Sequence, residues 1–369
     1  MSVPFRDLAR QTEAIRPELD EALDRVLRSG RYLFGEELER FEAAFAAYCG
    51  VSDVIGVGNG TDAVSIALQA VGVAAGDEVI TAANTCVPTI AAIEHAGAVP
   101  VLVDADPATR TLDPAQVERA ITPRTKAVLP VHLYGLCADV QALTEIASRH
   151  GIAVVEDCAQ AHGAEIDGRR AGSFGLAAAF SFYPTKNLGA IGDGGAVATS
   201  DEHVAERARL LRNYGERGRF EHILRGRNSR LDALQAAVLT VKLARLDRWT
   251  ARRREIGARY QAALADTTLR LPADVDGRRH AYHLYVVEAD ARDAFRAALG
   301  AAGVETSVHY PRPVHLQPAY RELGRGRRLP VSERLAGTVV SLPMFPELAD
   351  DEIEHVARAA RSAALAQPG

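Results

Sequence analysis

Residues 139–158 read DVQALTEIASRHGIAVVEDC, and this stretch decides the fold class. Its first part has a helical pattern and closes with Gly151 in the position of a C-cap. Its second part is an apolar, β-branched run without polar alternation, which is typical of a strand buried on both faces. A helix followed at once by such a strand is the unit from which parallel sheets are built.

The same unit recurs on the N-terminal side of this stretch. Short β-branched runs occur at 77–83 (DEVITAA), 99–105 (VPVLVDA) and 126–132 (KAVLPVH), with a helical pattern at 87–97 between two of them. Residues 36–48 place Leu38, Phe41, Phe45 and Tyr48 at helical spacing. We therefore expect an α/β fold with a mostly parallel sheet and helices on both faces.

The pattern changes after about Leu231. Residues 231–266 form one long helical stretch, followed by an extended run at 281–289, a helix at 293–303 and an extended run at 337–344. We expect a large domain over 1–246 and a smaller C-terminal α+β domain over 247–369. The triplet at 252–254 (Arg-Arg-Arg) is expected to lie on a solvated helix face rather than to bind phosphate.

Composition excludes several classes of protein. With 369 residues, 47% of them hydrophobic and 25% charged, the chain suits about two globular domains and is not disordered. A net charge of −5 offers no global basic surface for nucleic acid. No window approaches the roughly 20 apolar residues of a membrane span. The four cysteines form no CxxC pair, so we expect no metal site, no disulfide framework and a cytoplasmic location.

Two motifs lie where strands are expected to end. Residues 58–62 (GNGTD) precede a helix, and they suit either a phosphate at the helix N-terminus or a tight turn with Thr61 or Asp62 as N-cap. Asp157 ends a strand, where it would meet a cationic ligand group or simply cap the next turn. Neither motif decides between its two interpretations alone.

Residues 177–197 (AAAFSFYPTKNLGAIGDGGAV) place Lys186 directly after an apolar strand. A desolvated lysine has a lowered pKa and becomes a nucleophilic amine, whereas an ordinary loop lysine lies in solvent. Together, a phosphate loop, a strand-end aspartate and this lysine are the three contacts that pyridoxal phosphate requires. The combination predicts a pyridoxal-phosphate enzyme.

The chain resembles the DegT/StrS-type family of pyridoxal-phosphate-dependent nucleotide-sugar aminotransferases over essentially its whole length. The motifs that carry the resemblance include 58–68 (GNGTDAVSIAL), 154–164 (VVEDCAQAHGA), 181–197 (SFYPTKNLGAIGDGGAV), 226–239 (GRNSRLDALQAAVL) and 309–320 (HYPRPVHLQPAY). The resemblance implies the aspartate-aminotransferase fold (fold type I) and a homodimer with shared active sites.

The resemblance also implies roles for single residues. Lys186 would bond to the cofactor aldehyde and carry protons, Asp157 would pair with the pyridinium nitrogen, and Gln160 would contact the ring hydroxyl. Further cofactor contacts would come from Gly60, Thr61 and Ser181 at the phosphate, from Asn228 at the phosphate of the neighbouring subunit, and from Cys86, which stands where many relatives have an aromatic side chain against the ring.

The sugar site implied by the resemblance involves Tyr183, His309 and Tyr310. A pyrophosphate would also need cationic partners, for which Arg31, Arg219 and Arg227 are candidates. The expected reaction is transamination of a nucleotide-linked, dTDP-type 3-keto-6-deoxyhexose with glutamate as donor. A 4-keto sugar is the nearest alternative. A regulatory protein that binds the cofactor without turnover is the alternative from another class. A sugar dehydratase of the same fold is disfavoured, because such enzymes typically have histidine at the position of Lys186.

Overall fold

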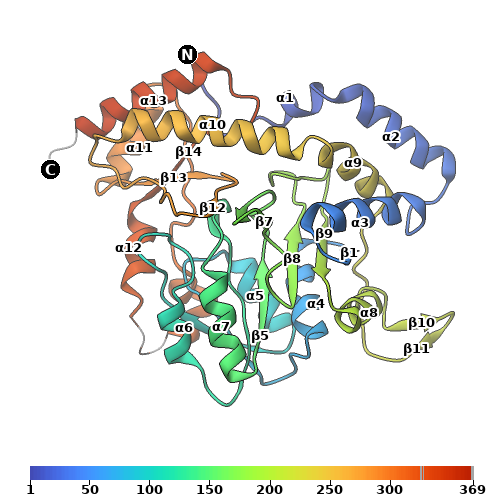
Figure 1. Cartoon of the computed structure of the whole chain (residues 1–369). Helices are drawn as coiled ribbons and strands as arrows, with labels where there is room; N and C mark the ends of the chain where they lie inside the picture. Colours follow the sequence, from blue (N-terminus) through green and yellow to red (C-terminus); the bar gives the residue numbers. More distant parts are fainter. Residues whose placement is uncertain (325, 327, 367–369) are drawn as a thin grey trace.

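In the computed structural model, which describes residues 1–324, 326 and 328–366, a seven-stranded sheet forms the middle of the molecule (Figure 1). In spatial order its strands are β1 (Asp53–Val57), β9 (Gly195–Thr199), β8 (Ala177–Ser181), β5 (Ala153–Asp157), β4 (Thr125–Val128), β2 (Glu78–Ala82) and β3 (Val99–Val103). The five strands from β8 to β3 are mutually parallel, and β9 is antiparallel to both of its neighbours. The prediction of a mostly parallel α/β sheet is confirmed.

Helices cover both faces of this sheet. Along β8 the side chains alternate: Ala177 and Ala179 join one core, and Ala178 and Phe180 join the other. The first core is closed by α4 (Gly60–Ala70), α5 (Val87–His95) and α8 (Glu202–Leu211). The second is closed by α3 (Glu36–Cys49), α7 (Val140–His150) and α9 (Ala233–Leu243), while α6 (Pro114–Ala120) packs beside α7. Burial on both sides explains why the strands lack polar alternation.

The C-terminal part has a hydrophobic core of its own, around the antiparallel pair β13 (Tyr285–Glu288) and β14 (Val339–Leu342). This core is covered by α10 (Leu246–Leu264), α11 (Arg292–Ala301) and α13 (Asp350–Leu365), and α12 (Pro330–Thr338) leads into β14. Val3, at the other end of the chain, is buried in the same core and pairs with Val304. The domain boundary at 246/247 stays a prediction, and the first residues pack with the C-terminal part.

The long helical stretch predicted over 231–266 is two helices. The chain turns at Ala244 and Arg245, so that α9 packs against α2 (Arg16–Ser29) and α3, whereas α10 packs against α13. The helix α10 continues through Gly257. A Cβ at this position would lie 2.8 Å from the ring of Tyr282, so only glycine lets the helix approach this ring so closely. The glycine therefore serves close packing rather than helix termination.

The remaining elements are short. They are α1 (Leu8–Glu13), β6 (Glu165–Ile166), β7 (Arg169–Arg170), β10 (Glu216–Gly218), β11 (Glu221–His222), β12 (Arg278–Arg279) and the 3₁₀ turns η1 (Leu133–Gly135), η2 (Val314–Leu316) and η3 (Pro318–Gly324). The hairpin of β10 and β11 projects from the body of the molecule (Figure 1).

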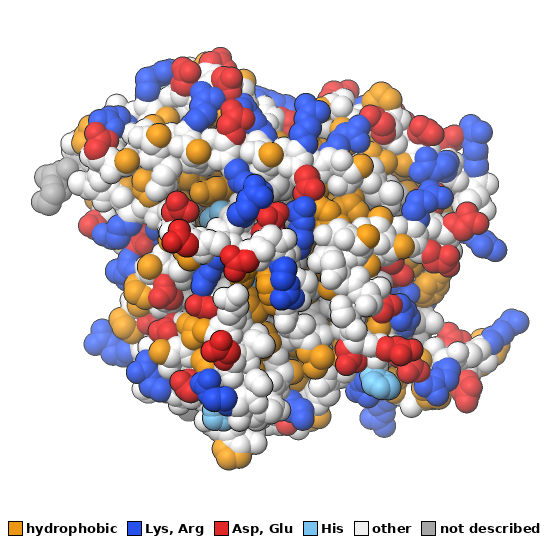
Figure 2. Space-filling model, in the orientation of Figure 1, with side chains coloured by type: hydrophobic (Ala, Val, Ile, Leu, Met, Phe, Trp, Pro, Cys, Tyr) orange, Lys and Arg blue, Asp and Glu red, His pale blue; other side chains and the backbone are white. Residues whose placement is uncertain are grey.

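The surface carries charges of both signs. On the face drawn in Figure 2, acidic and basic side chains are interspersed rather than gathered into large patches of one sign. Exposed ion pairs such as Arg16–Asp20 and Arg28–Asp24 on α2 are examples of this mixture, and pairs of this kind contribute little to stability. None of the described helices combines the length and the apolar composition that crossing a membrane requires.

Candidate active site

Lys186 lies in the tight loop that follows β8. Its backbone N–H donates to the carbonyl of Tyr183 over 2.8 Å, and Gly189 passes so close that a Cβ there would lie 2.3 Å from the carbonyl oxygen of Pro184. The loop thus folds back and leaves the lysine against the protein interior. Desolvation by burial lowers the pKa of the Lys186 amine, and the negative charge of the nearby Asp157 carboxylate acts in the opposite direction.

Asp157 is the last residue of β5 and is buried, with 3% of its surface exposed. Its carboxylate accepts hydrogen bonds from Thr89 Oγ1 over 2.9 Å and from the backbone N–H of Ala159 over 3.1 Å. Burial raises the pKa of this carboxyl, while the two hydrogen bonds and the charge of Lys186 oppose that rise. The side chain is therefore buried and held in one orientation by these two hydrogen bonds.

The segment 58–62 connects β1 to α4. Asn59 is the N-cap, because its side-chain oxygen accepts from the N–H of Asp62 over 2.8 Å; the expectation of Thr61 or Asp62 in that role was wrong. The N–H groups of Gly60 and Thr61 have no helical carbonyl to bond. A Cβ at Gly60 would lie 2.5 Å from Cβ and 2.8 Å from Oγ of Ser181, so glycine keeps this space open.

One cavity of about 670 Å³ brings these groups together. Of the residues singled out in the sequence, it is lined by Gly60, Thr61, Cys86, Asp157, Ser181, Tyr183, Lys186 and Tyr310. Three strand ends and the N-termini of two helices meet here, as expected where parallel strands share one edge of a sheet. Cys86 precedes α5, with its Sγ 3.5 Å from Thr89 Oγ1.

Gln160 and His309 line a second, adjoining cavity of about 350 Å³ that shares Tyr183, Lys186 and Tyr310 with the first. The Gln160 amide donates to the hydroxyl of Tyr310 over 3.1 Å and accepts from the N–H of Tyr134 over 2.7 Å. His309 Nδ1 lies 2.8 Å from Ser341 Oγ, and burial lowers the pKa of His309 to about 4.

The structure places the other candidates outside both cavities. Asn228 is exposed, in an antiparallel bridge with Asn213. Arg31 and Arg219 are exposed, and Arg227 donates to the side-chain oxygen of Gln69 over 2.8 Å.

Comparison with known proteins identifies the family. Residues 13–361 match the model of the DegT/DnrJ/EryC1/StrS aminotransferase family. The chain belongs to this family. It is 51% identical over 348 residues (94% of this chain, 92% of the relative) to the dTDP-3-amino-3,4,6-trideoxy-α-D-glucose transaminase of Streptomyces venezuelae.

Two further likenesses bear on the function. The chain is 49% identical over 360 residues (96% of this chain, 97% of the relative) to a protein of Geobacillus stearothermophilus named pleiotropic regulatory protein. It superimposes with a TM-score of 0.96 on the crystal structure of S. venezuelae DesV in complex with a ketimine intermediate, at 49% identity and 98% coverage of both chains. The protein is thus a sugar aminotransferase of fold type I, and its cofactor is pyridoxal phosphate.

The cavity fits this cofactor. The free N–H groups at the start of α4 and the space kept by Gly60 suit a phosphate. The buried carboxylate of Asp157 suits a cationic ring nitrogen, and the amine of Lys186 suits an aldehyde. The start of α4, the carboxylate of Asp157 and the amine of Lys186 all line one cavity.

Gly60→Ala is expected to weaken binding of pyridoxal phosphate about 10- to 100-fold, because an added methyl group in a filled site costs about 1–3 kcal/mol. The methyl group would collide with Ser181. Gly300→Ala in α11 is the matched control, since no atom of the described residues lies within 4 Å of the place that its Cβ would take, and this variant should bind the cofactor normally. Titration of the apoenzyme with cofactor measures both; equal affinities would contradict the phosphate position.

Two residues at the site carried no signal in the sequence. Thr89 bonds to Asp157 from the first turn of α5, although it reads as an ordinary helix residue. Arg6 lines the second cavity and donates through Nη1 to the carbonyl of Thr185 over 2.7 Å. The distance of 179 residues along the chain between Arg6 and Thr185 explains why only the tertiary structure reveals this contact.

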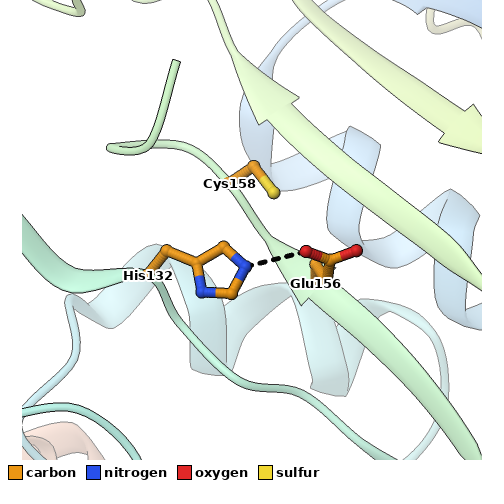
Figure 3. Close-up of side chains that lie close together, drawn as sticks. All are labelled: His132, Glu156 and Cys158. Carbon is orange, nitrogen blue, oxygen red and sulfur yellow. Dashed lines mark hydrogen bonds and ion pairs between the residues drawn. The ribbon is translucent and has the colours of Figure 1, made fainter. Parts of the chain in front are cut away.

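The two sequence neighbours of Asp157, Glu156 and Cys158, belong to a buried cluster with His132. Potential ligand atoms of His132, Glu156 and Cys158 lie within 4.8 Å of one another, and the imidazole points at the carboxylate (Figure 3). The N–H of Ala138 donates to His132 Nδ1 over 3.0 Å, so Nε2 carries the proton and donates to Glu156 over 2.9 Å. The Glu156 carboxylate accepts three more bonds, from the backbone N–H groups of Gly172, Phe174 and Gly175.

The cluster is saturated by these donors, and we interpret it as structural. Burial disfavours the charge of Glu156, but the bonds from His132 and the backbone more than offset this and hold the pKa of Glu156 below its usual value. His132 also donates its backbone N–H to the carbonyl of Asp157 over 3.0 Å. The cluster therefore holds the C-terminal end of β5 in place, and with it Asp157, the last residue of this strand.

Glu156→Gln is expected to lower the free energy of unfolding by about 3 kcal/mol at neutral pH, because an amide N–H would face backbone donors. A carboxyl with a lowered pKa stabilises the fold above its unfolded pKa, and this contribution is lost as the pH falls through the folded value. The difference in unfolding free energy between the wild type and Glu156→Gln should therefore become smaller in acid. Urea unfolding at about pH 7 and about pH 4 measures it; Glu118→Gln, at an exposed ion pair, is the control. A difference that grows in acid would contradict this role.

Proposed function

We propose that this protein transfers the amino group of glutamate to C3 of a dTDP-linked 3-keto-6-deoxyhexose. The observation that carries the proposal is the single cavity in which Lys186, Asp157 and the start of α4 meet. The substrate class is supported by the likeness to the S. venezuelae enzyme, whose name gives a dTDP-3-amino sugar as the compound on which it acts.

When bound, pyridoxal phosphate supplies an aldehyde that takes up the amino group and a ring that withdraws electrons. Lys186 would be the amine that bonds to this aldehyde at rest. Its lowered pKa increases the neutral fraction near pH 7, so the freed amine can take the proton from the donor α-carbon. The same amine returns a proton when the sugar carbon is aminated.

Other side chains hold the cofactor. Asp157 would pair with the ring nitrogen and keep it protonated, and Gln160 would contact the ring hydroxyl. Cys86 would pack on the ring face with less contact area than an aromatic side chain gives. Gly60, Thr61 and Ser181, which line the cavity at the start of α4, would bind the phosphate.

The ketosugar enters past Tyr183, whose side chain is 53% exposed at the cavity. Tyr310 and His309 offer a hydroxyl and an imidazole in the second cavity beside Lys186, and Tyr310 lines the first cavity as well. The low pKa of His309 leaves its ring neutral near pH 7, so it would hydrogen-bond to sugar hydroxyls rather than pair with a charge.

We further propose a homodimer in which Asn228 reaches the cofactor phosphate of the partner subunit. Asn228 is exposed, yet its neighbour Ser229 is fixed against the phosphate loop by bonds to Asp62 (2.7 Å) and to the N–H of Gly58 (3.0 Å). Asn228 is therefore held beside the phosphate loop by the bonds of Ser229 but is itself exposed, as expected for a residue that reaches the active site of a partner subunit. The cytoplasmic location stays a prediction.

Mixing the Asn228→Ala and Lys186→Ala variants tests the shared site. A mixed dimer would hold one site with both changes and one intact site, so activity should exceed that of either parent. No recovery after confirmed subunit exchange would rule out the sharing.

A panel of dTDP- and UDP-linked 3-keto and 4-keto sugars tests the reaction. With nitrogen-labelled glutamate as donor, mass spectrometry should find the label in the product of a dTDP-linked 3-keto sugar. Faster labelling of a 4-keto sugar would overturn the position of the ketone. Transfer from another amino acid alone would overturn the donor.

The alternative of a regulatory protein without turnover does not hold, because the chain is an aminotransferase of this family. The regulatory name of the relative from G. stearothermophilus belongs to that protein alone.

A further inference from the structure

Of the described residues that line the cavity beside Lys186, on the side of the N-terminal segment, none carries a carboxylate. This cavity has a volume of about 350 Å³ and is lined by Phe5, Arg6, Gln160, Tyr183, Thr185, Lys186, His283, His309 and Tyr310. Its permanently charged group is the guanidinium of Arg6, which is partly buried and lies in the same lining as the amine of Lys186. A cation withdrawn from water without an anion is costly unless a ligand supplies the negative charge.

The guanidinium of Arg6 makes fewer hydrogen bonds within the described part of the chain than its N–H groups allow. Its Nη1 donates to the carbonyl of Thr185, but its Nε is buried and has no acceptor among the residues that the structure describes. No ion pair in the described part of the chain includes Arg6; the adjacent Asp7 instead caps α1 and pairs with Arg10. Burial lowers the pKa of Arg6 to about 10, which leaves it charged at neutral pH.

The segment that carries Arg6 is fixed in place. Val3 exchanges backbone hydrogen bonds with Gly303 (2.9 Å) and Glu305 (3.0 Å), and Phe5 stacks on His309 with 5.9 Å between ring centres. The guanidinium is therefore presented to the cavity from a rigid support and bonds to the residue directly before Lys186. Such pre-organisation is what a specific anion contact requires.

We propose that Arg6 binds the α-carboxylate of the amino-acid donor and so positions the donor α-carbon at Lys186. This inference rests on the proposed function, in which an α-amino acid is the donor. The α-carboxylate is bonded directly to the carbon whose proton Lys186 removes, so its recognition group must lie in the cavity that holds the lysine. The pyrophosphate of a nucleotide sugar is farther from the reacting carbon, because C1, C2 and the glycosidic oxygen lie between them. Arginine suits a carboxylate through paired N–H donors.

The donor half-reaction tests the proposal without any sugar. The bound cofactor is converted to its amino form by L-glutamate or by isoglutamine, in which only the α-carboxylate is replaced by a neutral amide, and the absorbance change is followed. Arg6→Gln should lower kcat/KM for glutamate about 10- to 100-fold, mainly through KM, and should hardly change that for isoglutamine. Arg6→Lys should recover part of the loss.

Arg16→Gln, at an exposed arginine of α2, is the matched control and should behave as the wild type. An equal loss with glutamate and isoglutamine would overturn the proposal, because the effect would then be general disturbance of the loop. A loss confined to the ketosugar half-reaction would also overturn it and would assign Arg6 to the pyrophosphate.

Binding of glutarate, which has carboxylates but no amine, gives a readout without turnover. Calorimetric titration should show binding to the holoenzyme that Arg6→Gln weakens about tenfold or more. Equal binding by both proteins would contradict the proposal. Failure of every ketosugar to react would remove the proposed sugar function, but it would leave the glutamate and glutarate results to decide the role of Arg6.

Discussion

Lys186→Ala is expected to lower transamination by about 10⁴-fold or more, because one change removes both the amine that bonds to the cofactor and the base that moves the proton. The fold should persist, since the loop is held by backbone bonds such as that from Ala190 to Phe182. Turnover is measured with glutamate and the best ketosugar of the panel, and circular dichroism checks folding.

The chain offers clear controls for this variant, since its three lysines are Lys126, Lys186 and Lys242. Lys126 is exposed on β4, and Lys126→Ala should keep full activity. Borohydride reduction of the wild-type holoenzyme, followed by peptide mapping, should find the cofactor on Lys186 alone. Normal turnover by Lys186→Ala, or labelling of Lys242 instead, would refute the catalytic assignment.

Asp157→Asn is expected to lower turnover about 10²- to 10³-fold while most of the cofactor affinity remains. An amide is nearly the same size as a carboxylate but carries no charge, so it does not keep the ring nitrogen protonated, and a positioned charge of this kind is worth several kcal/mol in a buried site. The phosphate loop and Lys186 would still hold the cofactor.

Cofactor titration and steady-state rates together measure this separation. Asp20→Asn, at an exposed aspartate of α2, is the control. An unchanged rate in Asp157→Asn would contradict pairing with the ring nitrogen.

Much of the fold and of the candidate site follows from local pattern. Runs such as 152–158 have the composition of strands buried on both faces, and parallel strands bring their carboxyl ends to one edge. For that reason Asp157, the loop at 58–62 and Lys186 could be expected at one place, and they line one cavity. The roles assigned to them remain predictions that the experiments above test.

Other features depend on contacts between segments that are distant in the sequence. The triplet at 252–254 was expected to lie on a solvated face, but Arg253 is buried and donates to the carbonyls of Tyr282 and Met344. The break at Ala244 and Arg245 is likewise set by what α9 and α10 pack against. No local sequence pattern predicts that an arginine is buried, or that the chain turns between two segments that both have helical periodicity.

The sequence alone determined that buried strands alternate with helices in the large N-terminal part and that Asp157 and Lys186 follow the ends of such strands, because periodicity and burial act over a few neighbouring residues. Only the tertiary structure decided that Thr89 orients Asp157, that the N-terminal segment packs with the C-terminal core and that Arg6 faces Lys186. These contacts form because buried donors, acceptors and charges need partners, and the partner that meets each need is chosen by three-dimensional packing rather than by proximity along the chain.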